Sequence, residues 1–183
     1  MTDVGLTKPA NTILVAGSPL VQTLKVETAT NMYAGRLAIQ GTNDDAVTVG
    51  GAWALNSMAV GWLGYEQTTK KHRPATVDTI YLINANVAVL NGGHFVIVAA
   101  LQASQGTLKK GDALVMGTDG CVAKATAQTA TTPAGAVAVT SSGAQPVMTQ
   151  AGGIPAQGPI VGYAEETIAD VAAITDIMVR SVI

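Results

Sequence analysis

The chain has 183 residues, of which 48% are hydrophobic and only 12% are charged, and its formal net charge is −2. Because domains that bind duplex nucleic acid carry a basic surface, this balance argues against nucleic acid as a direct partner. The longest apolar runs, such as 95–101, are the size of a strand and fall far short of the roughly 18 residues of a transmembrane helix, so we expect no membrane partner.

Groups that carry chemistry are few and scattered. His72 and His94 have no second ligand at metal spacing, and we interpret the lone Cys121 as a small buried apolar residue. The neighbours in Asp44-Asp45 and in Glu165-Glu166 point to opposite faces of a strand, so we interpret them as turn residues and a solvated strand end. Catalysis needs clustered titratable groups, so we expect no enzyme, cofactor or metal.

The first strands follow a polar N-terminal segment. Residues 1–12 are small and polar and include Pro9, which predicts an extended arm before a single β domain over 13–183. Short strands are expected at 12–16 and at 20–27, where Leu20, Leu24 and Val26 share one face of a period-two pattern.

The next strands are expected at 36–40 and 46–49, on either side of the turn formers 41–45, and at 58–66. Gly61 and Gly64 interrupt the last of these, and a glycine within a strand often marks a bulge that helps a sheet to curve into a barrel. The segment 67–77 is basic and breaks the pattern. We interpret it either as a solvated loop or as a loop that docks to an acidic protein surface.

Two hairpins are predicted from turn residues that accept positive φ. The strands 79–90 and 94–101 are joined by Asn91-Gly92-Gly93, and the strands 112–117 and 121–125 by Asp119-Gly120. Both faces of the first hairpin are apolar, which predicts a place inside a closed barrel or at a subunit interface. The Ala/Thr/Gly-rich segment 126–158 is expected to be mostly loop, and strands are expected at 159–166 and 177–183 with a turn or short helix between them.

The whole pattern predicts a mainly β fold. We expect a small β-barrel or sandwich with an extended N-terminal arm and a long Ala/Thr/Gly-rich loop. Among the aromatic residues, Trp62 is expected in the core, whereas Trp53 fits either the core or an interface.

Several motifs follow one another along the chain: Tyr33-Ala34-Gly35-Arg36-Leu37 with 41–44, then 60–66, 108–114 with the Asp119-Gly120 hairpin, and 160–164 before 177–180. In this order they resemble the capsid cement (head decoration) proteins of tailed bacteriophages, over about residues 31–125 and 159–183. The resemblance implies a β-rich, non-enzymatic virion protein, made in the host cytoplasm. Such proteins form homo-oligomers, here expected to be trimers, on the outer surface of the capsid and bridge subunits of the major capsid protein.

The candidates for contact with the capsid or another partner belong to the arm, to Trp53 and to the basic loop. They are Thr2, Asp3, Val4, Leu6, Lys8, Trp53, Lys70, Lys71 and Arg73. We expect residues 1–12 to be disordered in the free protein and to order on the capsid by adding a strand to an exposed edge.

Other functions are left open by the sequence. The segment 109–114 also resembles the Gly-Asp turn of biotinyl and lipoyl carrier domains, although those place a modifiable lysine at a hairpin tip, where this chain has Asp119-Gly120. Another small β-barrel binding module is a related alternative. A hydrolase site assembled from distant residues such as Asp112 and His94 is the last.

Overall fold

A computed structural model of the chain describes residues 13–51, 58–65, 80–125 and 158–183. The strands are β1 (Leu14–Ala16), β2 (Leu20–Val26), β3 (Leu37–Gln40), β4 (Ala46–Val49), β5 (Ala59–Leu63), β6 (Asn86–Asn91), β7 (Val96–Leu101), β8 (Ala113–Met116), β9 (Val122–Lys124), β10 (Ile160–Ala164) and β11 (Thr175–Ser181). The predicted mainly β fold is confirmed. Within these ranges, no helix has the length and apolar character needed to span a membrane.

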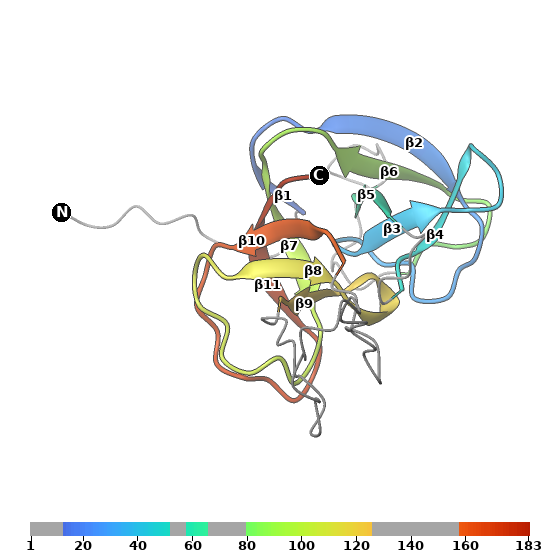
Figure 1. Cartoon of the computed structure of the whole chain (residues 1–183). Coiled ribbons are helices and arrows are strands. Elements are labelled where there is room, and N and C mark those ends of the chain that lie inside the picture. Colours follow the sequence, from blue (N-terminus) through green and yellow to red (C-terminus); the bar gives the residue numbers. More distant parts are fainter. Residues whose placement is uncertain (1–12, 52–57, 66–79, 126–157) are drawn as a thin grey trace, which may run out of the picture.

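Five strands form a first barrel, closed in the order β2-β4-β3-β5-β6 (Figure 1). β2 runs parallel to β4, and the other neighbours are antiparallel. The expected pair of strands around 41–45 is confirmed as β3 and β4, which pair from Ala38 opposite Val49 to Gln40 opposite Val47.

Five of the remaining six strands form a second barrel in the order β7-β11-β10-β8-β9 (Figure 1). Leu101 of β7 lies opposite Val122 of β9 and closes the ring. β1 pairs with the start of β7, where Leu14 lies opposite Ile97, and β9 pairs with the end of the same strand at Leu101.

A glycine lets strands approach closely at a bulge in each barrel. In β5 the register against β3 shifts next to Gly61, where a Cβ atom would lie 2.6 Å from the Leu90 carbonyl oxygen. In β10 the register against β8 shifts next to Gly162, where a Cβ atom would lie 2.7 Å from the Arg180 carbonyl oxygen. The predicted role of glycine in curving the sheet is therefore confirmed for Gly61.

The hairpin around Asp119-Gly120 is confirmed. Asp119 and Gly120 both have positive φ, 52° and 68°, and the Cys121 N–H donates to the Thr118 carbonyl at 3.0 Å. These are the features of a type I′ turn, whose twist matches that of the flanking strands.

The hairpin predicted around Asn91-Gly92-Gly93 is wrong. Both glycines have positive φ, but β6 pairs with β2 and β5 in the first barrel, and β7 pairs with β11, β1 and β9 in the second. The Gly92 N–H donates to the Ile183 carbonyl at 3.1 Å, so the turn residues bond to the C-terminus and lead the chain from one barrel to the other. The preceding strand is also shorter than predicted. It begins at Asn86, because the Ala85 N–H donates to Leu82 in a turn.

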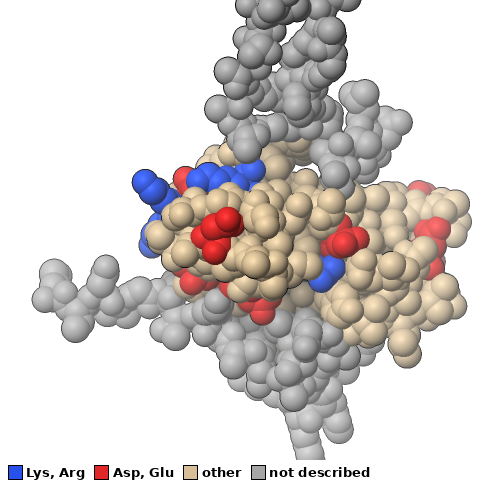
Figure 2. Space-filling model, turned by 90° about the horizontal axis from the view of Figure 1, so that it is seen from below, with Lys and Arg blue, Asp and Glu red and all other residues tan. Residues whose placement is uncertain are grey.

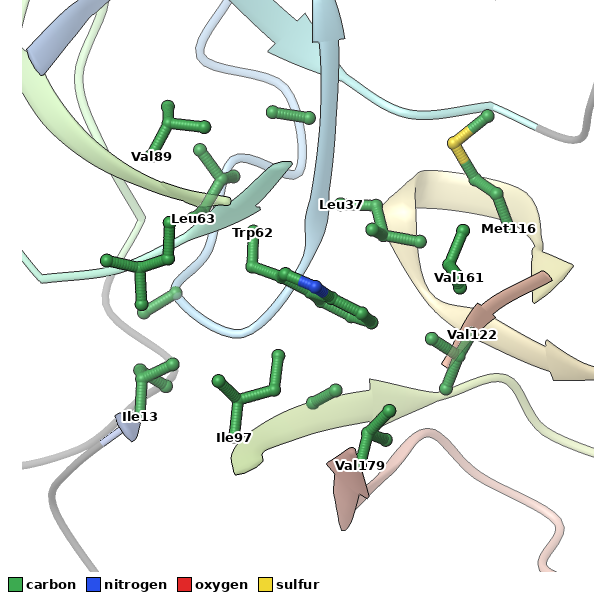
Figure 3. Packing of buried hydrophobic residues seen from close by; sticks show 14 of the residues in the cluster. Ile13, Leu37, Trp62, Leu63, Val89, Ile97, Met116, Val122, Val161 and Val179 are labelled. Carbon is green, nitrogen blue, oxygen red and sulfur yellow. The ribbon is translucent and has the colours of Figure 1, made fainter. Parts of the chain in front are cut away.

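The two barrels share one hydrophobic core. Trp62 of β5 is fully buried, as predicted, and Figure 3 shows its indole ring extending toward Val122 of the second barrel. Its Nε1 donates to Ser181 Oγ of β11 at 2.9 Å, and Ser181 is itself fully buried. Residues of both barrels therefore stabilise each other through apolar packing and a buried hydrogen bond.

Candidate functional site

The predicted contact residues lie outside the described residues. They are Thr2, Asp3, Val4, Leu6, Lys8, Trp53, Lys70, Lys71 and Arg73. The described residues next to these segments are Ile13, whose carbonyl accepts the Val98 N–H at 2.8 Å, and Met58 and Ile80, whose side chains are exposed. We call the described residues from Ile13 onward the body of the protein. The hydrogen bond to Val98 thus fixes Ile13 to the body, at the point where residues 1–12 join β1.

The interpretation of Glu165-Glu166 as a solvated strand end is wrong. The Glu165 side chain is only 14% exposed and pairs with Lys110 at 3.4 Å and with Arg180 at 3.3 Å. Glu166 accepts the Met178 N–H at 2.6 Å. Both carboxylates therefore connect the end of β10 to its neighbours, because β11 runs alongside β10 and supplies Arg180 and Met178.

Asp112 is engaged with lysines rather than with His94. Its Oδ2 accepts the Lys109 N–H at 2.9 Å and lies 2.7 Å from Lys124 Nζ. These two contacts, the first more than the second, lower the pKa of the Asp112 carboxyl. His94 is exposed and lies before β7, whereas Asp112 lies before β8. In the closed barrel, β9 separates these two strands on one side, and β10 and β11 separate them on the other. The structure does not bring these two residues together as a hydrolase pair.

The turn with the carrier-like motif lies apart from the β8–β9 hairpin tip. The Asp112 N–H donates to the Lys109 carbonyl at 3.0 Å, and Gly111 has a positive φ of 92°, so 109–112 forms a turn before β8. At the hairpin tip, Gly120 is buried and its N–H donates to the Gly50 carbonyl. The tip is packed against the first barrel and bears no lysine.

A cavity of about 540 Å³ lies at the junction of the two barrels, lined by Tyr33, Ala34, Arg36, Ala100, Ile174, Thr175 and Asp176. Arg36 is 9% exposed; its guanidinium donates to the Asp119 carbonyl at 3.0 Å and stacks on the Tyr33 ring, 4.6 Å from the centroid. Gly35 is held between the barrels, since its N–H donates to Leu63 and its carbonyl accepts the Ala100 N–H. The 33–37 motif thus joins the two barrels, a role that the sequence does not reveal.

Cys121 is buried beside this junction, as predicted. Burial raises the pKa of its thiol, although the positive charge of Arg36 acts in the opposite direction. A thiol with a raised pKa stays protonated near neutral pH and is a weak nucleophile.

The exposed surface carries large apolar side chains at strand ends and turns. Leu82 and Ile83 are 69% and 58% exposed in the turn before β6, where Asn84 has a positive φ of 63°. Leu20 and Val21, at the start of β2, are 67% and 47% exposed. The shared inner face predicted for Leu20, Leu24 and Val26 is therefore buried only toward Val26. Figure 2 shows that the described surface on one face is mostly uncharged.

No protein-family model matches the sequence, and no curated protein matches it. Within the described ranges, no group of three or more His, Cys, Asp or Glu residues is placed to hold a metal ion. The geometry joins Arg36, Asp112 and Glu165 to structural partners and leaves apolar strand ends exposed.

Proposed function

We propose that this chain is a structural virion protein that binds the outside of a tailed-phage capsid and stabilises it by bridging major capsid subunits. The observation that carries the proposal is the contrast between the charged groups, which have structural partners, and the large apolar side chains that are exposed. Arg36, Asp112 and Glu165 hold the body together, whereas Leu20, Val21 and Leu82 are exposed. Exposed apolar groups of this kind suit association with another protein. The resemblance of the ordered sequence motifs to capsid cement proteins suggests that this partner is the major capsid protein.

The architecture supports a clamp better than a catalyst. Two closed barrels with a shared core resist deformation, because interiors packed to crystal density transmit strain rather than absorb it. A clamp repeated over a symmetric shell also gains avidity from many weak contacts. The expected partners are the major capsid protein and further copies of this chain.

The test is binding of the purified protein to expanded capsids from the source of the sequence, prepared from particles that lack this chain. We expect co-sedimentation at a near-stoichiometric ratio to the major capsid protein and a higher temperature of capsid disruption. Protein that stays in the supernatant at saturating concentration contradicts the proposal. The intact mass of the protein from its source gives a second check, since an added biotinyl or lipoyl group indicates a carrier instead.

A deletion of residues 1–12 tests which part makes the contact. We expect the truncated protein to keep its fold and lose capsid binding, because the described body begins with Ile13 already buried and bonded to Val98. The matched control is Lys25→Ala, which removes an exposed ion pair with Asp45 and is expected to bind as the wild type does. Unchanged binding of the truncated protein assigns the contact to the body.

A further inference from the structure

Among the described strands, the first half of β2 has a partner on one side only. β6 pairs with β2 from Leu20 to Lys25, whereas β4 pairs with β2 at Lys25 and Val26 alone. Figure 1 shows β2 at the outer margin of the molecule. Among the described strands, none pairs with the second side of residues 20–24.

The backbone groups of Val21 and Thr23 point toward this open side. The Val26 N–H donates toward β6, to Ala85 at 2.9 Å, and the Lys25 N–H donates toward β4, to Asp45 at 2.8 Å. Hydrogen-bonding directions alternate along a strand, and the pairing of β2 with β6 has no register shift. The N–H and C=O groups of Val21 and Thr23 are therefore directed away from β6.

The sequence of this edge, residues 20–24, has none of the features that commonly prevent pairing. Residues 20–24 include no charged side chain, and Leu20 and Val21 are 67% and 47% exposed. Natural edge strands are commonly blocked by charges, prolines or bulges. Here Pro19 and Lys25 lie at the two ends, and the five residues between them include no proline and no charge.

We propose that this edge pairs with the same edge of a second copy of the chain, in antiparallel orientation about a twofold axis at Gln22. In that register Val21 lies opposite Thr23 of the second copy and Leu20 lies opposite Leu24. Each of the two Val21–Thr23 pairs exchanges two backbone hydrogen bonds, since these residues direct both groups outward. Leu20 gains an apolar neighbour across the axis.

Neighbouring registers do not fit. A twofold axis at Val21 sets Thr23 opposite Pro19, which has no N–H to donate. A twofold axis at Thr23 sets Val21 opposite Lys25, whose N–H already bonds to Asp45. The self-complementary register at Gln22 is therefore the one that satisfies both outward residues, and it brings no like charges together.

The contact is small. Five residues from each copy are fewer than the 20–30 a side of a standard interface, so we expect a weak pair that forms at high protein concentration. A twofold contact closes with two copies and thus differs from the trimer implied by the family resemblance. The inference concerns the isolated protein and does not depend on the proposed capsid function.

Disulfide trapping tests the register. Residues facing each other in a non-hydrogen-bonded antiparallel pair have Cα atoms about 4.5 Å apart, within the range that a disulfide spans. We expect the variant Gln22→Cys to form a covalent dimer under mild oxidation at least tenfold faster than Thr23→Cys. In the proposed pair, the two copies of position 23 lie about 8 Å apart, beyond disulfide range. Cys121 is only 1% exposed, so the wild type should form no disulfide-linked dimer and serves as the control. Equal rates for the two variants overturn the register.

A charge exchange provides a second test that does not depend on oxidation. Val21→Lys/Thr23→Lys places like charges opposite each other across the axis, whereas Val21→Glu/Thr23→Lys places opposite charges there twice. We expect the second variant to dimerise at least tenfold more tightly by analytical ultracentrifugation at low salt. Its net charge stays at −2, while the two lysines bring the first variant to zero, so an effect of net charge alone predicts the reverse order. Equal or reversed affinities contradict the proposal.

Discussion

A buried hydrogen bond between the two barrels provides a sensitive test of the fold. Trp62 Nε1 donates to Ser181 Oγ at 2.9 Å, and both residues are fully buried. Ser181 Oγ also lies 3.2 Å from the Ile183 carbonyl and 3.3 Å from the Ile183 N–H. The substitution Ser181→Ala removes the hydroxyl and leaves the indole N–H in the core without this acceptor.

The expected loss of stability follows from the indole N–H of Trp62, which no longer has its acceptor. A buried polar group that loses its partner destabilises a protein by about 1–3 kcal/mol. The contacts to Ile183 are longer and add less, so we expect Ser181→Ala to lower the free energy of unfolding by about 2 kcal/mol. This is a large share of the 5–15 kcal/mol typical of a domain.

Urea unfolding followed by circular dichroism measures the effect, and a double-mutant cycle with Trp62→Phe isolates it. Trp62→Phe alone also loses packing, but once the indole N–H is gone, Ser181→Ala no longer leaves it unpaired. We therefore expect a coupling of about 1–2 kcal/mol between the two substitutions. The exposed Ser18→Ala is the control and should stay within about 0.5 kcal/mol of the wild type. A change in Ser181→Ala no larger than the control refutes the reasoning.

Two further predictions concern a turn and a carboxylate. Gly120→Ala should destabilise the protein by about 2 kcal/mol more than Gly111→Ala in the same urea assay. Both glycines have positive φ. A Cβ atom at Gly120 would lie 2.5 Å from the Leu37 carbonyl oxygen, whereas a Cβ atom at Gly111 would have no neighbouring atom within 4 Å. Because the pKa of Asp112 is lower in the folded than in the unfolded protein, its ionised carboxylate stabilises the fold at pH values above the unfolded pKa of about 3.9. This stabilisation is lost as the pH falls through the folded pKa. The Tm difference between wild type and Asp112→Asn should therefore narrow from about pH 6 to about pH 3, and a constant difference contradicts the assignment.

Local turn chemistry predicted part of the topology. Asp119-Gly120 forms the expected turn because its strands, β8 and β9, bury their side chains in the same barrel, so the local and tertiary preferences agree. Asn91-Gly92-Gly93 has the same local preference for positive φ, but β6 and β7 pair with other strands instead of with each other. β6 pairs with β2 over six residues and β7 with β11 over six residues. Pairing between distant segments therefore decided the fold at this turn.

The surfaces were harder to predict than the strands. Leu20, Leu82 and Ile83 belong to apolar segments whose periodicity indicates strands, and periodicity does not reveal where a strand loses its cover. Asn84 provides a weak local signal for the turn, since asparagine accepts positive φ more readily than most residues. The junction formed by Arg36 and Asp119 joins residues 83 positions apart, and nothing in either local sequence indicates the contact.

Because both barrels are closed, different residues are expected to determine the stability of the fold and the association between copies. Most described strands have partners on both sides, whereas β1 and the first half of β2 have an unpaired edge among the described strands. Gly17, with φ of 93°, and Pro19 join these two strands directly, so the open edges follow one another along a short stretch of chain. Substitutions at Val21 or Thr23 should therefore change association with little effect on unfolding, since neither side chain is buried. Substitutions at Trp62, Ser181 or Gly120 should do the reverse, because these residues lie where the two barrels meet.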